Sequence, residues 1–133
     1  MLLSSQTRVL IADDHEVLLE RVLSVLRSFQ VIGKVNNGKD LVAEALRLRP
    51  DVIVSDITMP ILNGIEAAHE LREAGSASRF VFLTVHDQPA FLDACFAEGA
   101  LGYVTKSRLG MDLIPAIHEA LSGRPFISPS IPR

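Results

Sequence analysis

Two adjacent carboxylates follow a hydrophobic stretch near the start of the chain. Asp13 and Asp14 come directly after the apolar run RVLIA at residues 8–12, although like charges repel and burying a charge is costly. Asp56 ends a second apolar run, DVIVSD, at residues 51–56. If the two runs are neighbouring parallel strands, the three carboxylates converge. A hard divalent cation would relieve their repulsion, and Mg²⁺ prefers carboxylate and carbonyl oxygens with several retained waters. The pattern therefore predicts a magnesium site at these three aspartates.

Two further strand ends carry polar groups that suit phosphoryl chemistry. Thr84 ends the run RFVFLT, and Lys106 follows the run LGYVT. With a cation in place, Asp56 can act as a nucleophile, because an aspartate can accept a phosphoryl group as an acyl phosphate. Lys106 would bring a positive charge on a flexible stem to the phosphoryl oxygens, and the Thr84 hydroxyl would donate a hydrogen bond to one of them.

Taken one at a time, these residues have ordinary structural explanations. Asp13 or Asp14 alone would cap the helix that follows, and a single lysine or threonine would be a surface or strand residue. Their joint placement at strand ends favours a site. His15 is a candidate for the rim of that site, although it is better explained as the opening of the first helix. His86, two residues after Thr84, is a second candidate for the rim.

The segments that must position these side chains alternate between two hydrophobic periods. Short apolar runs predict strands covered on both faces at residues 8–12, 51–56 and 79–84, with weaker strands at 31–36 and 101–105. Four stretches between them repeat apolar residues at helical spacing: Leu18, Val22, Val25 and Phe29; Leu41, Ala45 and Leu48; Ile65, Ala68 and Leu71; Ile114, Ile117 and Leu121. A fifth helix is predicted within residues 87–99, begun by Asp87 and ended by Gly99, and Pro115 is expected early in the last helix.

This alternation predicts an α/β fold. We expect a single doubly wound (βα)5 domain, with a flavodoxin-like five-stranded parallel sheet and helices on both faces. Ligands of such sheets bind beyond the carboxyl ends of the strands, where the polar residues above are expected. The tail SGRPFISPSIPR, with Pro125, Pro129 and Pro132, is typical of a linker.

Length and composition narrow the class of protein. The 133 residues suit one domain, and the net charge of −3 provides no basic footprint for nucleic acid. The one cysteine, Cys95, cannot form an intrachain disulfide and is interpreted as a core residue in a reducing compartment. Neither a membrane-spanning run nor a signal peptide is visible, so a cytoplasmic protein without membrane contact is expected.

The ordered motifs closely resemble the receiver domain of bacterial two-component response regulators, and the resemblance spans nearly the whole chain. It is carried by VLIADDH, DVIVSDITMPILNGIEAAHELR, FVFLTVHD and AEGALGYVTKS. The DDH start and the ending GRPFISP look most like the NarL/FixJ type. The resemblance implies that Asp56 is phosphorylated, that the Thr58 carbonyl joins Asp13, Asp14 and Asp56 around Mg²⁺, and that Thr84, Lys106 and Tyr103 form the response apparatus.

The same resemblance implies partners and a domain layout. A sensor histidine kinase would donate the phosphoryl group, and the phosphorylated chain could form a homodimer. Residues 1–124 are expected to be the receiver and residues 125–133 a linker or truncated end. DNA would be bound only through a helix-turn-helix domain that is absent from this chain, and that domain would control transcription. The alternative is a stand-alone receiver that acts through protein contacts.

The chain departs from the family pattern at three positions, and two other classes of protein are also considered. Ser55, Glu16 and Ser107 stand where an apolar residue, a proline and a proline are frequent, but none of them removes a reacting group. A phosphatase resembling the haloacid dehalogenase group would need a second aspartate two positions after the nucleophile, where this chain has Thr58. An interaction module that ignores phosphate would not need the complete set of acidic, hydroxyl and lysine groups.

Overall fold

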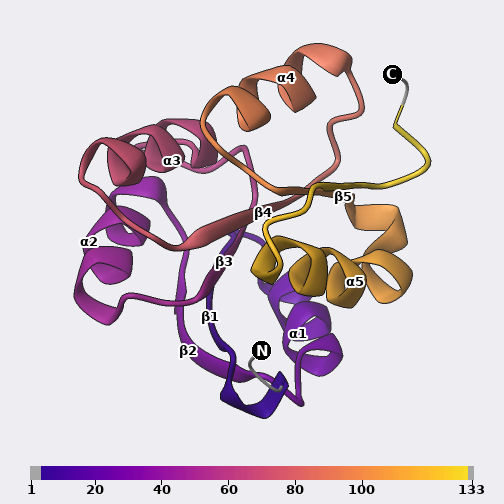
Figure 1. Ribbon diagram of the computed structural model, residues 1–133, viewed down its shortest axis with the longest axis horizontal. Coiled ribbons are helices and arrows are strands. Elements are labelled where there is room, and N and C mark those ends of the chain that lie inside the picture. The colour runs from indigo at the N-terminus through magenta and orange to yellow at the C-terminus, as the bar shows by residue number, and fades with distance from the viewer. Residues whose placement is uncertain (1–3, 132–133) are drawn as a thin grey trace.

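A computed structural model describes residues 4–131 of the chain, which form a parallel sheet between two layers of helices (Figure 1). The strands lie in the order β2-β1-β3-β4-β5-β6, and every neighbouring pair is parallel. Their bounds are β1 (Arg8–Ala12), β2 (Gln30–Val35), β3 (Val52–Ser55), β4 (Arg79–Thr84), β5 (Gly102–Thr105) and β6 (Phe126–Ile127). The predicted α/β class, its five strands and the neighbouring first and third strands are confirmed. The sixth strand was not predicted.

Five α-helices within the described residues cover the two faces of the sheet. Their bounds are α1 (Glu16–Val25), α2 (Gly38–Leu48), α3 (Gly64–Glu73), α4 (Pro89–Ala97) and α5 (Leu109–Leu121). Helices α1 and α5 lie against one face, and α2, α3 and α4 lie against the other (Figure 1). None of the helices described between residues 4 and 131 is long and apolar enough to cross a membrane.

Burial on both faces explains the continuous apolar runs of the central strands. In β1, Leu10 and Ala12 belong to the hydrophobic cluster under α2, α3 and α4, while Val9 and Ile11 belong to the cluster under α1 and α5. Successive side chains of a strand point to opposite faces, so an all-apolar run supplies both clusters. Cys95 is fully buried on α4, which confirms its interpretation as a core residue.

Three predicted details of the helices were wrong. Phe29 lies beyond the end of α1, in the turn before β2, although its side chain is buried as the spacing indicated. Helix α4 begins at Pro89 after Gln88, and Asp87 does not cap it; Gly99, with a φ of +88°, does follow its end. Pro115 is the seventh residue of α5 rather than an early one. Because Pro115 is exposed, water can reach the carbonyl of Met111 that lacks its helical partner.

The segment from Phe126 to Ile131 lies against the edge of the sheet. Strand β6 pairs with β5, which places Gly102 opposite Phe126 and Tyr103 opposite Ile127. Prolines on both sides of this short strand made it look like a linker, and two residues are too few to show a strand period. Pro132 lies outside the described residues.

Candidate functional site

The carboxyl ends of four strands meet at one edge of the sheet. The register pairs Ala12 with Ser55 and Thr84 with Thr105. The residues that directly follow paired strands therefore lie next to each other at this edge. The Asp56 N–H continues the ladder by donating to the Ala12 carbonyl at 2.9 Å. This register places the predicted site residues at the same edge.

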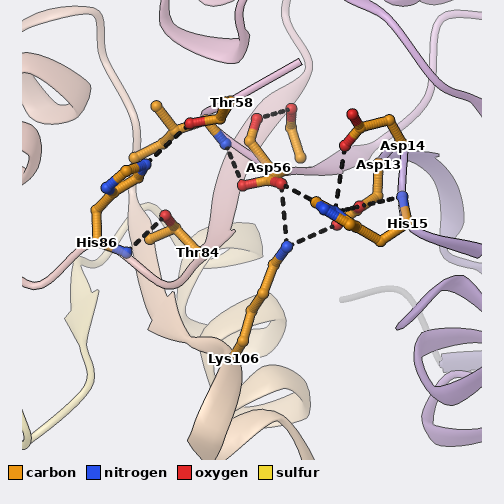
Figure 2. Close-up of polar contacts among 10 residues, drawn as sticks. Asp13, Asp14, His15, Asp56, Thr58, Thr84, His86 and Lys106 are labelled. Carbon is orange, nitrogen blue, oxygen red and sulfur yellow. Dashed lines mark hydrogen bonds and ion pairs between the residues drawn. The ribbon is translucent and has the colours of Figure 1, made fainter. Parts of the chain in front are cut away.

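An acidic cluster forms at this edge (Figure 2). Single ligand atoms of Asp13, Asp14, His15 and Asp56 all lie within 4.8 Å of one another. Asp13 and Asp56 are buried, whereas Asp14 and His15 are exposed, so one side of the cluster faces solvent. Three carboxylates with an open side form the oxygen-rich donor set that suits a hard divalent cation keeping some of its waters. The cluster could therefore hold the predicted Mg²⁺.

His15 lies at the open side of the cluster, as predicted for a rim residue. Its Nδ1 atom is 3.0 Å from Asp13 Oδ1, 3.2 Å from Asp14 Oδ1 and 3.8 Å from Asp56 Oδ2. It is also the N-cap residue of α1, although its side chain makes no capping bond. His15 is thus the N-cap residue of α1 and a neighbour of the acidic cluster, and its role at the site stays a prediction.

Lys106 reaches the two buried carboxylates from the end of β5. Its Nζ atom lies 3.0 Å from Asp56 Oδ2 and 3.3 Å from Asp13 Oδ2 (Figure 2). Burial raises the pKa of the Asp56 carboxyl above its usual range, and the nearby charge of Asp13 acts in the same direction. The Lys106 ammonium and the Ile57 N–H, which donates to Asp56 Oδ1 at 2.7 Å, oppose this rise without cancelling it.

A second group of contacts lies around His86. The Thr84 hydroxyl accepts from the His86 N–H at 3.1 Å, and the hydroxyl of the fully buried Tyr103 donates to the His86 carbonyl at 2.8 Å. The imidazole Nε2 lies 2.9 Å from Thr58 Oγ1, and the ring stacks on Phe91 with centroids 4.0 Å apart. Both hydroxyls therefore hold the backbone of the loop before α4.

The predicted residues thus fall into two neighbouring groups. Asp13, Asp14, His15, Asp56 and Lys106 come together directly, whereas Thr84, Tyr103, Thr58 and His86 form the group around the β4–α4 loop. In Figure 2 the labelled Thr84 and His86 lie on the other side of Asp56 from the acidic pair.

Two residues that position Asp56 were missed as such. Ser55 is fully buried, and its hydroxyl donates to the Asp56 carbonyl at 2.8 Å. A Cβ atom on Gly64 would lie 2.1 Å from the same carbonyl oxygen. The sequence marked Ser55 only as a departure from the family pattern, and the contacts of Ser55 and Gly64 with Asp56 depend on how the loop folds back onto β3.

Fold and site together define a doubly wound α/β domain with a cation-competent acidic cluster at the carboxyl edge of its sheet. Residues 9–118 match the family model described as the response regulator receiver domain. The chain therefore belongs to the family of response regulator receiver domains, which are signalling domains.

Relatives in this family include response regulators and the uncharacterized transcriptional regulatory protein YvfU of Bacillus subtilis (strain 168). The chain is 32% identical to the response regulator GacA of Pseudomonas aeruginosa over 127 residues, covering 93% of this chain and 59% of GacA. It is 31% identical to the nitrate/nitrite response regulator protein NarL of Escherichia coli (strain K12) over 126 residues, covering 92% of this chain and 58% of NarL.

A solved structure extends the likeness over nearly the whole chain. The two-component response regulator of the LuxR family from Aurantimonas sp. SI85-9A1 superposes with a TM-score of 0.90 at 32% identity, covering 96% of this chain and 93% of that one. The predicted resemblance to receivers of the NarL type is confirmed. The chain spans about three fifths of the length of the curated relatives named above.

Proposed function

We propose that this receiver accepts a phosphoryl group on Asp56 from a sensor histidine kinase in the cytoplasm, in a reaction that depends on Mg²⁺. One observation carries the proposal: Asp56 lies within reach of both a cation-competent carboxylate cluster and the Lys106 ammonium. A buried carboxylate held between these two charges is placed to be a nucleophile rather than a structural residue.

In the proposed reaction, one oxygen of the Asp56 carboxylate attacks phosphorus. The new O–P bond forms as the bond from phosphorus to the donor histidine nitrogen breaks, and that nitrogen keeps the electron pair. The Ile57 N–H holds Oδ1 and so fixes the plane of the carboxylate. Mg²⁺, held by Asp13, Asp14, Asp56 and the Thr58 carbonyl, would supply charge neutralisation at the phosphoryl oxygens.

Lys106 and Thr84 would stabilise the product. The Lys106 ammonium, released from Asp56 Oδ2, would form an ion pair with a phosphoryl oxygen. The Thr84 hydroxyl accepts from the His86 N–H, so its proton is available for a phosphoryl oxygen. A movement of Thr84 would release the His86 backbone, which Tyr103 also holds, and so change the loop before α4.

That change gives the proposed output. The surface of α4, β5 and α5 would exchange partners, and the phosphorylated chain could form a homodimer. By likeness to the relatives, transcription would be controlled through a helix-turn-helix domain attached to residues 125–133, with the receiver ending at residue 124. A stand-alone receiver acting through protein contacts is the alternative.

A labelling experiment tests the acceptor. The chain is incubated with Mg²⁺ and acetyl phosphate, and its intact mass is measured. We expect one added phosphoryl group in the parent chain and none in Asp56→Asn. Asp51→Asn is the matched control, because Asp51 lies just before the other end of β3, where its carboxylate accepts from the Arg8 N–H at 2.8 Å. Undiminished labelling of Asp56→Asn would refute the assignment.

A further inference from the structure

The C-terminal segment, residues 126–131, is held against the outer edge of β5 by backbone hydrogen bonds. The Phe126 N–H donates to the Leu101 carbonyl at 2.8 Å, and the Ser128 N–H donates to the Tyr103 carbonyl at 2.9 Å. The segment then turns, and the Ile131 N–H donates to the Ser128 carbonyl at 3.1 Å. In Figure 1 it runs as the yellow ribbon alongside β5.

A buried polar contact fixes this C-terminal segment in place. Ser128 is fully buried; its hydroxyl oxygen accepts from the Thr105 N–H at 3.1 Å and donates to Asp112 Oδ2 at 2.7 Å. Arg108 also donates to Asp112, at 2.6 Å to the same Oδ2 and at 3.2 Å to Oδ1. Hydrogen bonds to a charged group are stronger than neutral ones, so Ser128 is an anchor rather than a passive neighbour.

An apolar contact holds the far end of the same segment. Ile131 is 4% exposed and belongs to the hydrophobic cluster that contains Tyr103 and Cys95. Between the two anchors, Ser130 Oγ lies 3.2 Å from Thr105 Oγ1. A loose linker would not bury an isoleucine and a serine in this way.

The residues that bind this segment are next to those that reach the candidate site. Tyr103 accepts a hydrogen bond from the segment through its carbonyl, while its side chain holds the His86 carbonyl. Thr105 is bound by Ser128 and Ser130, and the next residue, Lys106, contacts Asp56. The end of β5 is therefore fixed from one side by the C-terminal segment and extends to the acidic cluster on the other.

We propose that residues 126–131 form a releasable strand whose docking on β5 opposes phosphorylation of Asp56; this inference rests on the proposed function. A phosphoryl group on Asp56 requires the Lys106 ammonium to leave Asp56 Oδ2, where it now lies at 3.0 Å. Docking of this strand holds Thr105 and therefore keeps the backbone of the next residue, Lys106, in its present position. The coupling between two equilibria is reciprocal. If phosphorylation of Asp56 weakens docking of the strand, release of the strand must favour phosphorylation by the same factor.

Hydrogen exchange on the 133-residue chain tests this coupling directly. The probe is beryllofluoride with Mg²⁺, an analogue of the phosphoryl group, and exchange is followed at the amides of Thr105 and Ser128. We expect exchange at both amides to become at least tenfold faster when the analogue is bound. If the analogue binds and their exchange is unchanged or slower, Lys106 moves alone on its flexible stem and the inference is wrong. If the analogue does not bind at all, the proposed function fails and the inference falls with it.

A pair of serine variants gives the reciprocal measurement. Ser128→Ala removes the hydroxyl that joins Asp112 to Thr105, and we expect it to bind beryllofluoride at least threefold more tightly than the parent chain. Ser122→Ala, at the exposed end of α5, is the matched control and should bind as the parent does. Equal or weaker binding by Ser128→Ala would overturn the inference. If that variant does not fold, the exchange measurement on the parent chain decides.

Discussion

Gly64→Ala should destabilise the chain, because the new methyl group has nowhere to go. Its Cβ would lie 2.1 Å from the Asp56 carbonyl oxygen and 3.0 Å from both Phe82 Cε1 and Ser55 Oγ. The worst contact is with backbone, so about 1.3 Å of movement is needed to reach an ordinary separation, and two hydrogen bonds resist it. Gly64 N–H donates to the Ile57 carbonyl at 2.7 Å, and Ser55 holds the Asp56 carbonyl.

The size of the effect follows from the cost of overpacking. Such insertions cost about 1–3 kcal/mol, and the upper part of that range applies because the closest atom, the Asp56 carbonyl oxygen, belongs to the backbone. At about 4 °C per kcal/mol for a chain of this length, the melting temperature should fall by about 8–12 °C. Acetyl phosphate labelling should also fall, because the clash displaces the residue that bears the proposed nucleophile.

Urea denaturation of two alanine variants checks this reasoning. Gly110, the second residue of α5, has no atom within 4 Å of an added Cβ, so Gly110→Ala should stabilise by up to about 1 kcal/mol. The same substitution is thus expected to act with opposite signs at the two positions. If Gly64→Ala unfolds within about 0.5 kcal/mol of the parent chain, the close approach to Asp56 does not constrain the loop as argued.

Three other predictions concern the metal, the thiol and the buried carboxylate. Mg²⁺ should raise the melting temperature by mass action, and the rise should vanish in Asp13→Asn; an equal rise there would place the ion elsewhere. Burial raises the pKa of Cys95 to about 12, so at pH 8 a thiol reagent should react at least a hundredfold faster in urea than with the folded chain, and rapid native labelling would contradict the burial. Although burial acts to raise it, hydrogen bonds from Arg108 and Ser128 keep the pKa of Asp112 below its usual value. Its ionised form therefore stabilises the fold above about pH 4, and this contribution is lost as the pH falls through the lowered pKa. Asp112→Asn should cost about 1–3 kcal/mol at pH 7 and much less near pH 2, as measured by urea denaturation; a cost independent of pH would rule out the charged contact as its source.

The order of elements could be predicted because the central strands are buried on both faces. The runs VLIA and VIVS have almost no polar residue, which is typical of strands in a parallel sheet covered on both faces. Once the first and third strands were taken as neighbours, the meeting of Asp13, Asp14 and Asp56 followed from the shared carboxyl edge. Lys106 followed by the same reasoning, since it comes directly after β5.

The parts that were missed depend on contacts between distant segments. Strand β6 has only two residues, and its place is decided by Ser128 and Ile131, whose partners lie on β5, α5 and the cluster near α4. Phe29 keeps the helical spacing of α1 but lies in the turn that follows, where its side chain is buried in the cluster under α1 and α5. Residue periodicity describes one element at a time, so it does not show which side chains from other elements will fill a given space.

The distance along the chain between Asp56 and Lys106 has a consequence for protein synthesis. The two residues are 50 positions apart, and they meet only after β1, β3, β4 and β5 have paired. A nascent chain that has released Asp56 but not β5 from the ribosome lacks the ammonium and cannot carry out the proposed transfer. Chains still being translated would therefore not accept a phosphoryl group from a kinase. The ability to accept it would arise in one step, when β5 is added to the sheet.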